Sequence, residues 1–260
     1  MRRIIFTAAA ALAISLGGCG DDDASIAADS GAAAEGELVV SAATSLKAAL
    51  TDYGNDYDAA TVRLSFAGSD QLAAQIRQGV RPDVFASANT KLPDALFSEG
   101  LVEQPVVFAG NRLVIAVPRG STKVSSLGDL AASGVKIAAG SASVPVGAYT
   151  RKVLSQLPAS ERNAILGNVR SSEPDVGGVV GKLTQGAVDA GFVYRTDVTG
   201  AGGALKGIEL PAKLEPDVAY GVAVVKGAEH EAAARAFVDG LLGAVGQEAL
   251  TAAGFAPAPK

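Results

Sequence analysis

Two serines follow predicted strands at the points where helices are expected to begin. Residues 38–42 form a β-branched run followed by Ser45, and residues 62–66 form a second run followed by Ser69. The first turn of a helix presents backbone N–H groups without intrahelical partners, together with the positive end of the helix dipole. Each serine could therefore donate hydrogen bonds to an anion, or could simply cap its own helix.

Three further sources of donors are expected in the second half of the chain. Residues 143–147 and 173–177 each open a predicted helix around a proline, a residue that suits the start of a helix. Tyr194 ends the apolar run 190–194, so its hydroxyl is expected at the carboxyl edge of a strand, where open α/β sheets bind ligands. The alternative for Tyr194 is a core tyrosine that is bonded to the backbone.

This set of groups offers hydrogen-bond donors and no basic side chain. A helix dipole contributes about 0.3–1 kcal/mol and a hydrogen bond to a charged partner about 1.5–3 kcal/mol, so several converging donors can hold a dianion. We interpret Asp70 and Asp175 as partners of the helix dipoles, because a carboxylate beside a dianion would repel it. Hydrogen phosphate would need an acceptor carboxylate, whereas sulfate would not. The sequence therefore predicts a site for a fully deprotonated oxyanion with two negative charges.

The composition argues against several other classes of function. The chain of 260 residues has one cysteine, so Cys19 can form no disulfide within the chain. It also has one histidine, His230, which we interpret as a solvated helix position; no enzyme is expected. Removing Arg2 and Arg3 lowers the 22 basic residues to 20 against 27 acidic ones, a net charge near −7. That balance argues against a nucleic-acid partner.

The first residues are typical of an exported lipoprotein. A basic start precedes the apolar run 4–16, which is too short to span a bilayer, and small residues then lead to Cys19. This pattern resembles the bacterial lipobox, which implies that 1–18 are a signal peptide and that Cys19 carries the lipid. The alternative is an ordinary secretory signal with a chance cysteine. Residues 19–36 hold too few apolar side chains to fold and are interpreted as a flexible tether. We therefore expect a membrane anchor on the periplasmic or extracytoplasmic face.

The rest of the chain alternates strand-like and helix-like segments, which predicts an α/β fold with parallel strands. The expected strands are 38–42, 62–66, 84–87, 113–118, 136–139, 190–194, 208–210 and 220–225. The expected helices are 46–59, 70–78, 91–99, 147–157, 175–185 and 229–251. Chain crossings near residues 118 and 220 would give two lobes with a ligand cleft between them. The predicted boundaries are 37–117 and 220–260 for the first lobe and 118–219 for the second.

Six motifs occur in an order that is similar to one known family. They are AATSL at 42–46, FAGS at 66–69, PDVFASAN at 82–89, GNRLV at 110–114, VPVGAY at 144–149 and VYRTD at 193–197. Over nearly the whole mature chain these segments resemble the bacterial molybdate-binding proteins of the molybdate ABC transporter. The resemblance implies a class II periplasmic-binding-protein fold and a molybdate or tungstate ligand without any cofactor. It also implies a monomer whose partners are an ABC permease and its ATPase subunit.

The resemblance further implies five ligand-binding residues. Ser45 and Ser69 would donate to the anion through their hydroxyl and backbone N–H groups. Val146 and Val176 would donate through backbone N–H groups, and Tyr194 through its hydroxyl. The metal would be held as an oxyanion, with no direct bond to the protein.

The chain departs from the family pattern at two of these turns. Val146 stands where alanine is common, which a backbone donor tolerates, and Gly68 stands where serine or alanine is frequent. Arg195, next to Tyr194, could face solvent or approach the cleft. The alternative functions are a binding protein for another tetrahedral oxyanion such as sulfate, or a sensory binding domain without a role in transport.

Overall fold

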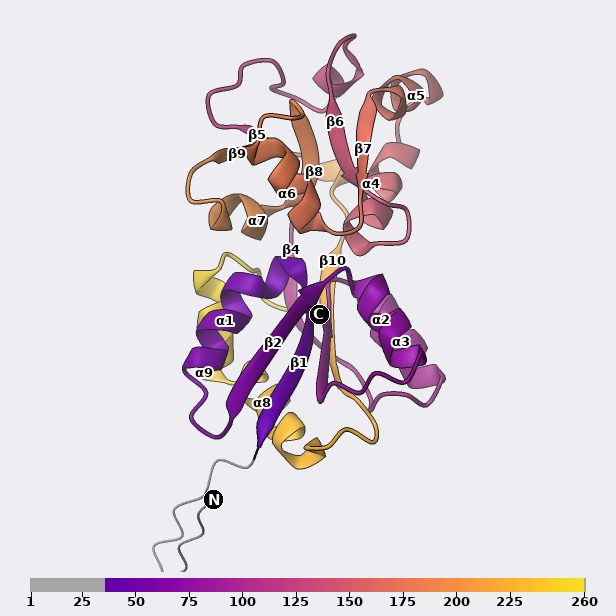
Figure 1. Ribbon diagram of the computed structural model, residues 1–260. Coiled ribbons are helices and arrows are strands. Elements are labelled where there is room, and N and C mark those ends of the chain that lie inside the picture. The colour runs from indigo at the N-terminus through magenta and orange to yellow at the C-terminus, as the bar shows by residue number, and fades with distance from the viewer. Residues whose placement is uncertain (1–35, 260) are drawn as a thin grey trace, which may run out of the picture. The chain divides into compact units, whose positions relative to one another are not determined.

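The structure is a computed structural model that describes residues 36–259 (Figure 1). The predicted signal peptide 1–18, Cys19 and nearly all of the predicted tether 19–36 lie outside the described residues. Within the described part, no helix is both long enough and apolar enough to cross a membrane. The chain from residue 36 onward forms two lobes, each built on a five-stranded sheet. The predicted two-lobed α/β fold is confirmed.

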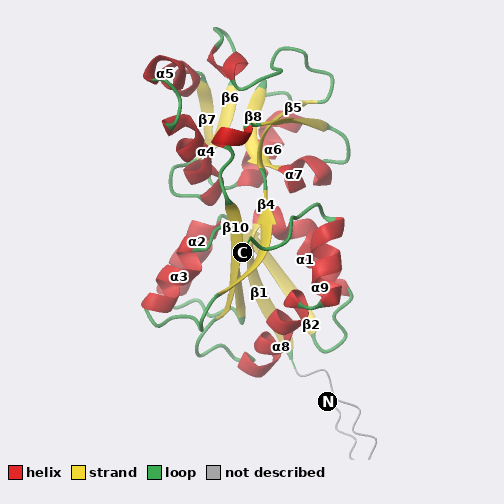
Figure 2. Cartoon of the chain, turned by 180° about the vertical axis from the view of Figure 1, so that it is seen from behind, coloured by secondary structure: helices red, strands yellow, loops and turns green. Residues whose placement is uncertain are grey.

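Lobe 1 has a mixed sheet with helices on both faces. Its strands, in sheet order, are β2 (Thr61–Ala67), β1 (Glu37–Ala43), β3 (Val84–Ser87), β10 (Val218–Val224) and β4 (Val106–Asn111). Its helices are the 3₁₀ turn η1 (Thr44–Leu46), α1 (Lys47–Asn55), α2 (Ser69–Arg77), α3 (Lys91–Ser98), α8 (Glu231–Leu242) and α9 (Ala244–Ala252). Strand β1 is parallel to β2 and β3, whereas β10 is antiparallel to β3 and β4. Figures 1 and 2 place α2 and α3 against one face and α1 and α9 against the other.

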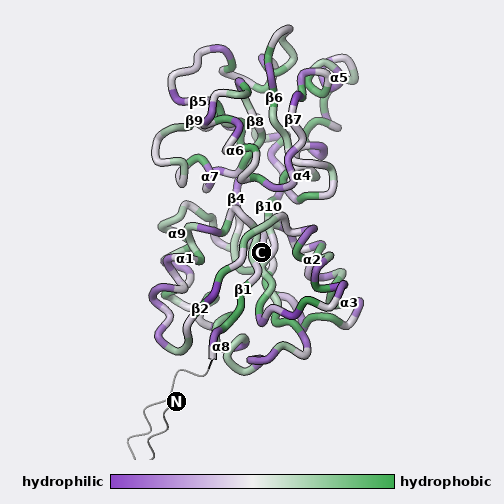
Figure 3. Tube along the Cα trace, viewed as in Figure 1, coloured by the Kyte–Doolittle hydropathy of each residue, from purple (hydrophilic) through white to green (hydrophobic). Residues whose placement is uncertain are grey.

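Burial follows the position of each strand in this sheet. The central strands β1, β3 and β10 are covered on both faces and are almost wholly buried. Strand β2 lies at the edge and alternates between exposed and partly buried side chains. Figure 3 shows hydrophobic residues along β1 and β10 and hydrophilic residues in β2. A continuous apolar run therefore marks a strand covered on both faces, and an alternating one marks a half-exposed strand.

Lobe 2 repeats the same plan. Its strands, in sheet order, are β7 (Val169–Glu173), β6 (Ile137–Gly140), β8 (Ala190–Tyr194), β5 (Leu113–Pro118) and β9 (Leu205–Glu209). Its helices are η2 (Gly128–Ala131), α4 (Pro145–Ser155), α5 (Ala159–Gly167), α6 (Val176–Thr184), α7 (Arg195–Gly200) and η3 (Ala212–Leu214). Strand β6 is parallel to β7 and β8, and β5 is antiparallel to β8 and β9.

The first crossing between the lobes lies earlier than the predicted boundary at 117. Strand β4 ends at Asn111 in the lobe 1 sheet, and β5 begins at Leu113 in the lobe 2 sheet, so Arg112 alone joins them. The boundary prediction is wrong here because β5 pairs with β8 and β9 and not with lobe 1. The chain returns at Val218, where β10 begins and pairs with β4.

The predicted C-terminal helix 229–251 is wrong as a single helix. Gly243, with extended backbone at φ −78° and ψ −175°, separates α8 from α9. Helix α9 then folds back closely, because a Cβ on Gly246 would lie 2.3 Å from the Cα of Leu241. Other elements absent from the prediction are β4, β7, α5, α7 and the 3₁₀ turns η2 and η3.

His230 is partly buried, which corrects its interpretation as a solvated position. It precedes α8, and its backbone N–H donates to Oδ1 of Asp83 at 2.9 Å. Its ring Nδ1 lies 3.5 Å from the same oxygen, and its side chain is 24% exposed. The second carboxylate oxygen of Asp83 accepts from the N–H of Val39 at 2.7 Å. Asp83 thus joins the start of α8 to β1.

Candidate anion-binding site

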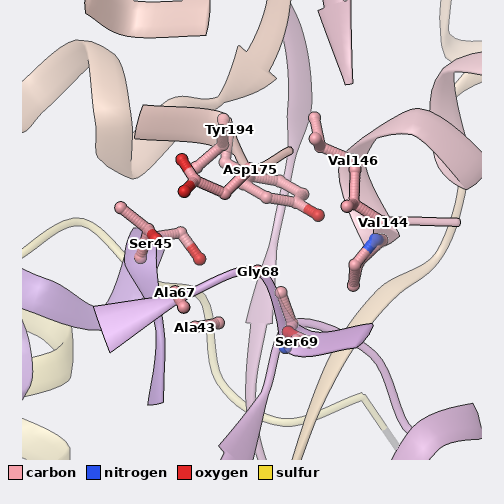
Figure 4. A pocket seen from close by; sticks show the side chains of 13 residues that line it. Ala43, Ser45, Ala67, Gly68, Ser69, Val144, Val146, Asp175 and Tyr194 are labelled. Carbon is pink, nitrogen blue, oxygen red and sulfur yellow. Dashed lines mark hydrogen bonds between the residues drawn. The ribbon is translucent and has the colours of Figure 1, made fainter. Parts of the chain in front are cut away.

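One small pocket brings the five predicted site residues together (Figure 4). Its lining is Ala43, Thr44, Ser45, Ala67, Gly68, Ser69, Ala88, Val144, Pro145, Val146, Asp175, Val176 and Tyr194. The pocket holds about 230 Å³ of empty space including its opening. The lining comes from both lobes, so a small ligand here would contact both.

Ser69 contributes a free hydroxyl hydrogen from lobe 1. It is the first residue of α2 and is 1% exposed, while Gly68 occupies the N-cap position. Its Oγ accepts a hydrogen bond from the backbone N–H of Ala88 at 3.1 Å. Because that bond uses the oxygen as an acceptor, the hydroxyl hydrogen is available to the pocket. The start of α2 has no side-chain cap, so Ser69 does not cap its own helix.

Ser45 is oriented by a tyrosine that sequence reasoning missed. Its Oγ lies 2.9 Å from Oη of Tyr220 on β10. The side-chain amide of Asn111, on β4, donates to the same Oη at 3.3 Å. Tyr220 can then donate its own hydrogen to Ser45, which leaves the Ser45 hydrogen for the pocket. No local pattern pointed to Tyr220, because it reaches Ser45 across 175 residues of sequence and only through the return of β10 to lobe 1.

The helix starts of lobe 2 present backbone donors. Helix α4 begins at Pro145, has Val144 at its N-cap position and lacks a side-chain cap. Val146 is the second residue of α4, and its N–H belongs to the first turn, which has no intrahelical acceptor. In α6 the N-cap Asp175 accepts from the N–H of Gly178 at 3.0 Å, and that leaves the N–H of Val176 uncapped.

Tyr194 ends β8 with a buried hydroxyl that has no hydrogen-bond partner. The residue is 1% exposed, and the rings of Tyr220 and Tyr149 lie edge-on to it at centroid distances of 5.8 and 6.4 Å. Burial raises the pKa of Tyr194 well above its ordinary value, so the hydroxyl stays protonated. It can therefore donate a hydrogen bond to a ligand in the pocket. A core tyrosine bonded to the backbone is therefore not what the structure shows. An unpaired buried hydroxyl costs about 1–3 kcal/mol, which a ligand oxygen would recover.

Thr44 is a further residue that the sequence analysis did not select. It begins η1, lines the pocket beside Ser45, and its buried Oγ1 also lacks a hydrogen-bond partner. In the sequence it differs little from any threonine before a helix. Only the three-dimensional pocket distinguishes it.

The charges around the pocket are sparse. No lysine or arginine lines it, and its only carboxylate, Asp175, is engaged as the cap of α6. Arg195 does not line the pocket and pairs with Glu209 at the surface. Asp197 does not line the pocket; it accepts the backbone N–H of Tyr194 at 2.8 Å, and its pKa is raised to about 7 by burial and by the charge of Asp175. Within residues 36–259 no three His, Cys, Asp or Glu side chains are grouped to hold a metal ion. The pocket thus suits an anion that accepts hydrogen bonds.

Comparisons with known proteins agree with this architecture. The model of the bacterial extracellular solute-binding protein family matches residues 38–256. The molybdate-binding protein ModA of Mycobacterium tuberculosis is 35% identical over 225 residues, covering 84% of each chain. The periplasmic molybdate-binding protein of Azotobacter vinelandii superposes with a TM-score of 0.77 at 23% identity, covering 86% of this chain and all of that one.

A third similar structure is the sulfate-binding protein SubI of Mycobacterium tuberculosis. It superposes with a TM-score of 0.76 at 17% identity, covering 85% of this chain and 86% of that one. At 23% and 17% identity, the two solved structures are evidence for the fold alone. The same fold can bind more than one oxyanion. The family match over residues 38–256 and the 35% identical relative establish the family as well as the fold. This chain belongs to the family of bacterial extracellular solute-binding proteins.

Proposed function

We propose that the protein captures molybdate, or tungstate of nearly the same size, and delivers it to an ABC permease with its ATPase subunit. The observation that carries this proposal is the buried hydroxyl of Tyr194, which lacks a partner inside a pocket that otherwise offers donors from two lobes. An anion with four acceptor oxygens fits such a set of donors. The similarity to a molybdate-binding protein over 84% of the chain supports molybdate in particular.

Each of the five residues has a defined part in the proposed complex. Ser45 and Ser69 donate from lobe 1 through hydroxyl and backbone N–H groups. Val146 and Val176 donate from lobe 2 through backbone N–H groups at helix starts. Tyr194 donates its hydroxyl. No cofactor and no direct bond from protein to metal is part of this proposal, and the relatives are binding proteins, so we propose no catalytic role.

The pocket chemistry argues against phosphate as the ligand. Near neutral pH phosphate carries a proton, and that proton needs an acceptor. The one carboxylate in the lining, Asp175, caps α6 through Oδ1, which accepts from Gly178, so only its Oδ2 is left as a carboxylate oxygen that could take this proton. Sulfate is the second candidate, because it is a deprotonated tetrahedral dianion like molybdate and because the fold also occurs in a sulfate-binding protein. Only the size of the pocket separates sulfate from the larger molybdate.

Titration calorimetry with four anions tests the proposal. We expect molybdate and tungstate to bind tightly and with similar affinity, sulfate to bind much more weakly, and phosphate not to bind measurably. Equal affinities for sulfate and molybdate would contradict the assignment of molybdate while leaving an oxyanion site in place. Preference for phosphate would contradict the donor-only description of the pocket.

We also propose that the mature protein is an exported monomer anchored through a lipid on Cys19. The basic and apolar start of the chain and the small residues before Cys19 support this. Replacing Cys19 by serine should release the protein from the membrane fraction and leave anion binding unchanged. A Cys19→Ser protein that stays with the membrane would contradict the lipid anchor without affecting the proposed ligand.

A further inference from the structure

Two glycines lie where the lobes touch beside the pocket. Gly68 belongs to lobe 1, and a Cβ placed on it would lie 2.5 Å from the carbonyl oxygen of Pro174 in lobe 2. Gly177 belongs to lobe 2, and a Cβ placed on it would lie 2.8 Å from Cγ2 of Thr44 in lobe 1. Each lobe therefore presents a glycine to the turn from which the other lobe donates.

Backbone conformation does not require glycine at either position. Gly68 has φ −60° and ψ 135°, which other residues adopt freely, and Gly177 lies inside α6 and is not among the glycines with positive φ. The requirement is space. Among the glycines of residues 36–259, these two alone would bring a Cβ within 3.0 Å of an atom in the opposite lobe. Other tightly packed glycines, such as Gly147 against Ser141, have their close neighbours in their own lobe.

Both contacts are next to proposed donors. Gly68 immediately precedes Ser69, and Gly177 immediately follows Val176 (Figure 4 shows the Gly68 turn between Ser69 and the lobe 2 residues). Thr44, which meets Gly177, immediately precedes Ser45. The distance between the lobes at these two contacts therefore sets the distance between the donors of lobe 1 and those of lobe 2.

The lobes are joined in a way that permits this distance to vary. A single residue, Arg112, links β4 to β5, and the second connection enters β10 at Val218. Lobes joined by short crossing segments can rotate about them as rigid bodies. In this structure the lobes meet at the two glycine contacts, so further closure would press these atoms together.

We propose that Gly68 and Gly177 determine how far the lobes close on the anion, and so determine which size of tetrahedral oxyanion the pocket retains. A methyl group at Gly68 meets a backbone oxygen, which cannot move aside without moving its lobe. A methyl group at Gly177 meets the end of the Thr44 side chain, which can adjust. The contact at Gly68 therefore limits closure of the lobes more strictly than the contact at Gly177. This inference rests on the proposed function in that a tetrahedral oxyanion must bridge the lobes.

The test compares Gly68→Ala and Gly177→Ala with a matched control, Gly181→Ala. Gly181 lies on the same helix as Gly177, and a Cβ there meets no atom within 4 Å. Calorimetry and stopped-flow dissociation would use molybdate and sulfate, and small-angle X-ray scattering would measure the contraction on binding. We expect the Kd of Gly68→Ala for molybdate to rise about tenfold or more, chiefly through faster dissociation, with a smaller rise for Gly177→Ala. Gly181→Ala should bind as the wild type does.

Two further readouts separate closure from a general loss of structure. Gly68→Ala should contract less than the wild type on binding, while the scattering of the ligand-free proteins is the same. It should also lose affinity for the smaller sulfate by a larger factor than for molybdate. Unchanged affinity and contraction in both Gly68→Ala and Gly177→Ala would overturn this inference and leave the proposed function standing. A wild-type protein that binds neither anion would overturn both.

Discussion

The two lobes supply the pocket with donors of different kinds. Lobe 1 contributes serine hydroxyls that already have partners inside the lobe, Tyr220 for Ser45 and Ala88 for Ser69. Lobe 2 contributes the first-turn N–H groups of two helices and the hydroxyl of Tyr194, which has no partner. The two serines of lobe 1 are thus oriented before any ligand arrives, whereas the buried hydroxyl of Tyr194 in lobe 2, like that of Thr44 in lobe 1, has no hydrogen-bond partner.

This difference predicts different consequences for substitutions in the two lobes. A side-chain donor that is held in place by its own lobe is lost outright when its hydroxyl is removed. An unpaired buried hydroxyl, in contrast, lowers the stability of the ligand-free protein by about 1–3 kcal/mol. Its removal should therefore weaken binding and, at the same time, stabilise the ligand-free protein. A backbone N–H donor, finally, remains when the side chain of its residue is replaced, so such a substitution should have little effect on binding.

The largest effect is expected from Ser45→Ala combined with Ser69→Ala. Each change removes a buried donor to a charged ligand, on the order of 1–3 kcal/mol, so together they should raise the Kd for molybdate about thirtyfold or more. Calorimetry measures this directly. Ser98→Ala is the control, because Ser98 is an exposed serine of the same lobe that bonds only to the carbonyl of Asp94. An unchanged Kd in the double variant would mean that lobe 1 does not contact the anion.

The next effect is expected from Tyr194→Phe, compared with Tyr53→Phe. Tyr194→Phe should raise the Kd by about ten- to a hundredfold, because one donor to the anion is lost. The ligand-free variant should be at least as stable as the wild type, since the lost hydroxyl had no partner. Tyr53 donates to the carbonyl of Phe237 at 2.9 Å, so Tyr53→Phe should lower the free energy of unfolding by about 1 kcal/mol and leave binding unchanged.

Denaturant unfolding and calorimetry on both variants separate the two roles. If Tyr194→Phe destabilised the ligand-free protein as much as Tyr53→Phe, the hydroxyl of Tyr194 would have a partner in solution. The contrast between the paired serine hydroxyls of lobe 1 and the unpaired hydroxyl of Tyr194 in lobe 2 would then be wrong.

Sequence reasoning reached the pocket because its signals are local. A serine after a strand, a proline at a helix start and a tyrosine at a strand end can each be recognised within a few residues, and all five selected residues line one pocket. What it missed depends on contacts between distant segments. Tyr220 reaches Ser45 only because β10 returns to lobe 1, and the significance of Gly68 depends on Pro174 in the other lobe.

The boundary between the lobes was mispredicted for the same reason. The apolar run of β5 fits either sheet, and only its pairing with β8 and β9 assigns it to lobe 2. The preceding strand β4, with two exposed valines at its start, lacked a clear strand pattern. Strand pairing over long sequence separations is not encoded in the periodicity of one segment.

A smaller difference between the lobes should appear in the pH dependence of stability. Burial raises the pKa of Asp197 in lobe 2 to about 7 from an ordinary value of 3.8. Between these values the folded state binds more protons than the unfolded state, so this contribution to stability is complete below about pH 4 and is lost as the pH rises through 7. Asp197→Asn keeps an oxygen that can accept the N–H of Tyr194 and removes the titration.

The stability of Asp197→Asn relative to the wild type should therefore increase as the pH rises from 5 to 8, measured by denaturant unfolding at each pH. A constant difference across that range would show that Asp197 titrates normally.

The smallest effect on binding is expected from Val146→Ala, and it tests the backbone part of lobe 2. The proposed donor is the N–H of residue 146, which alanine retains at the second position of α4. The side chain is 2% exposed, so its truncation should lower the free energy of unfolding by roughly 1–2 kcal/mol through lost burial. The Kd for molybdate should change less than about threefold, because no donor is removed. A loss of affinity as large as that of Tyr194→Phe, in a protein that still folds, would mean that the valine side chain and not the backbone fixes the anion. The assignment of residue 146 as a backbone donor of lobe 2 would then fail.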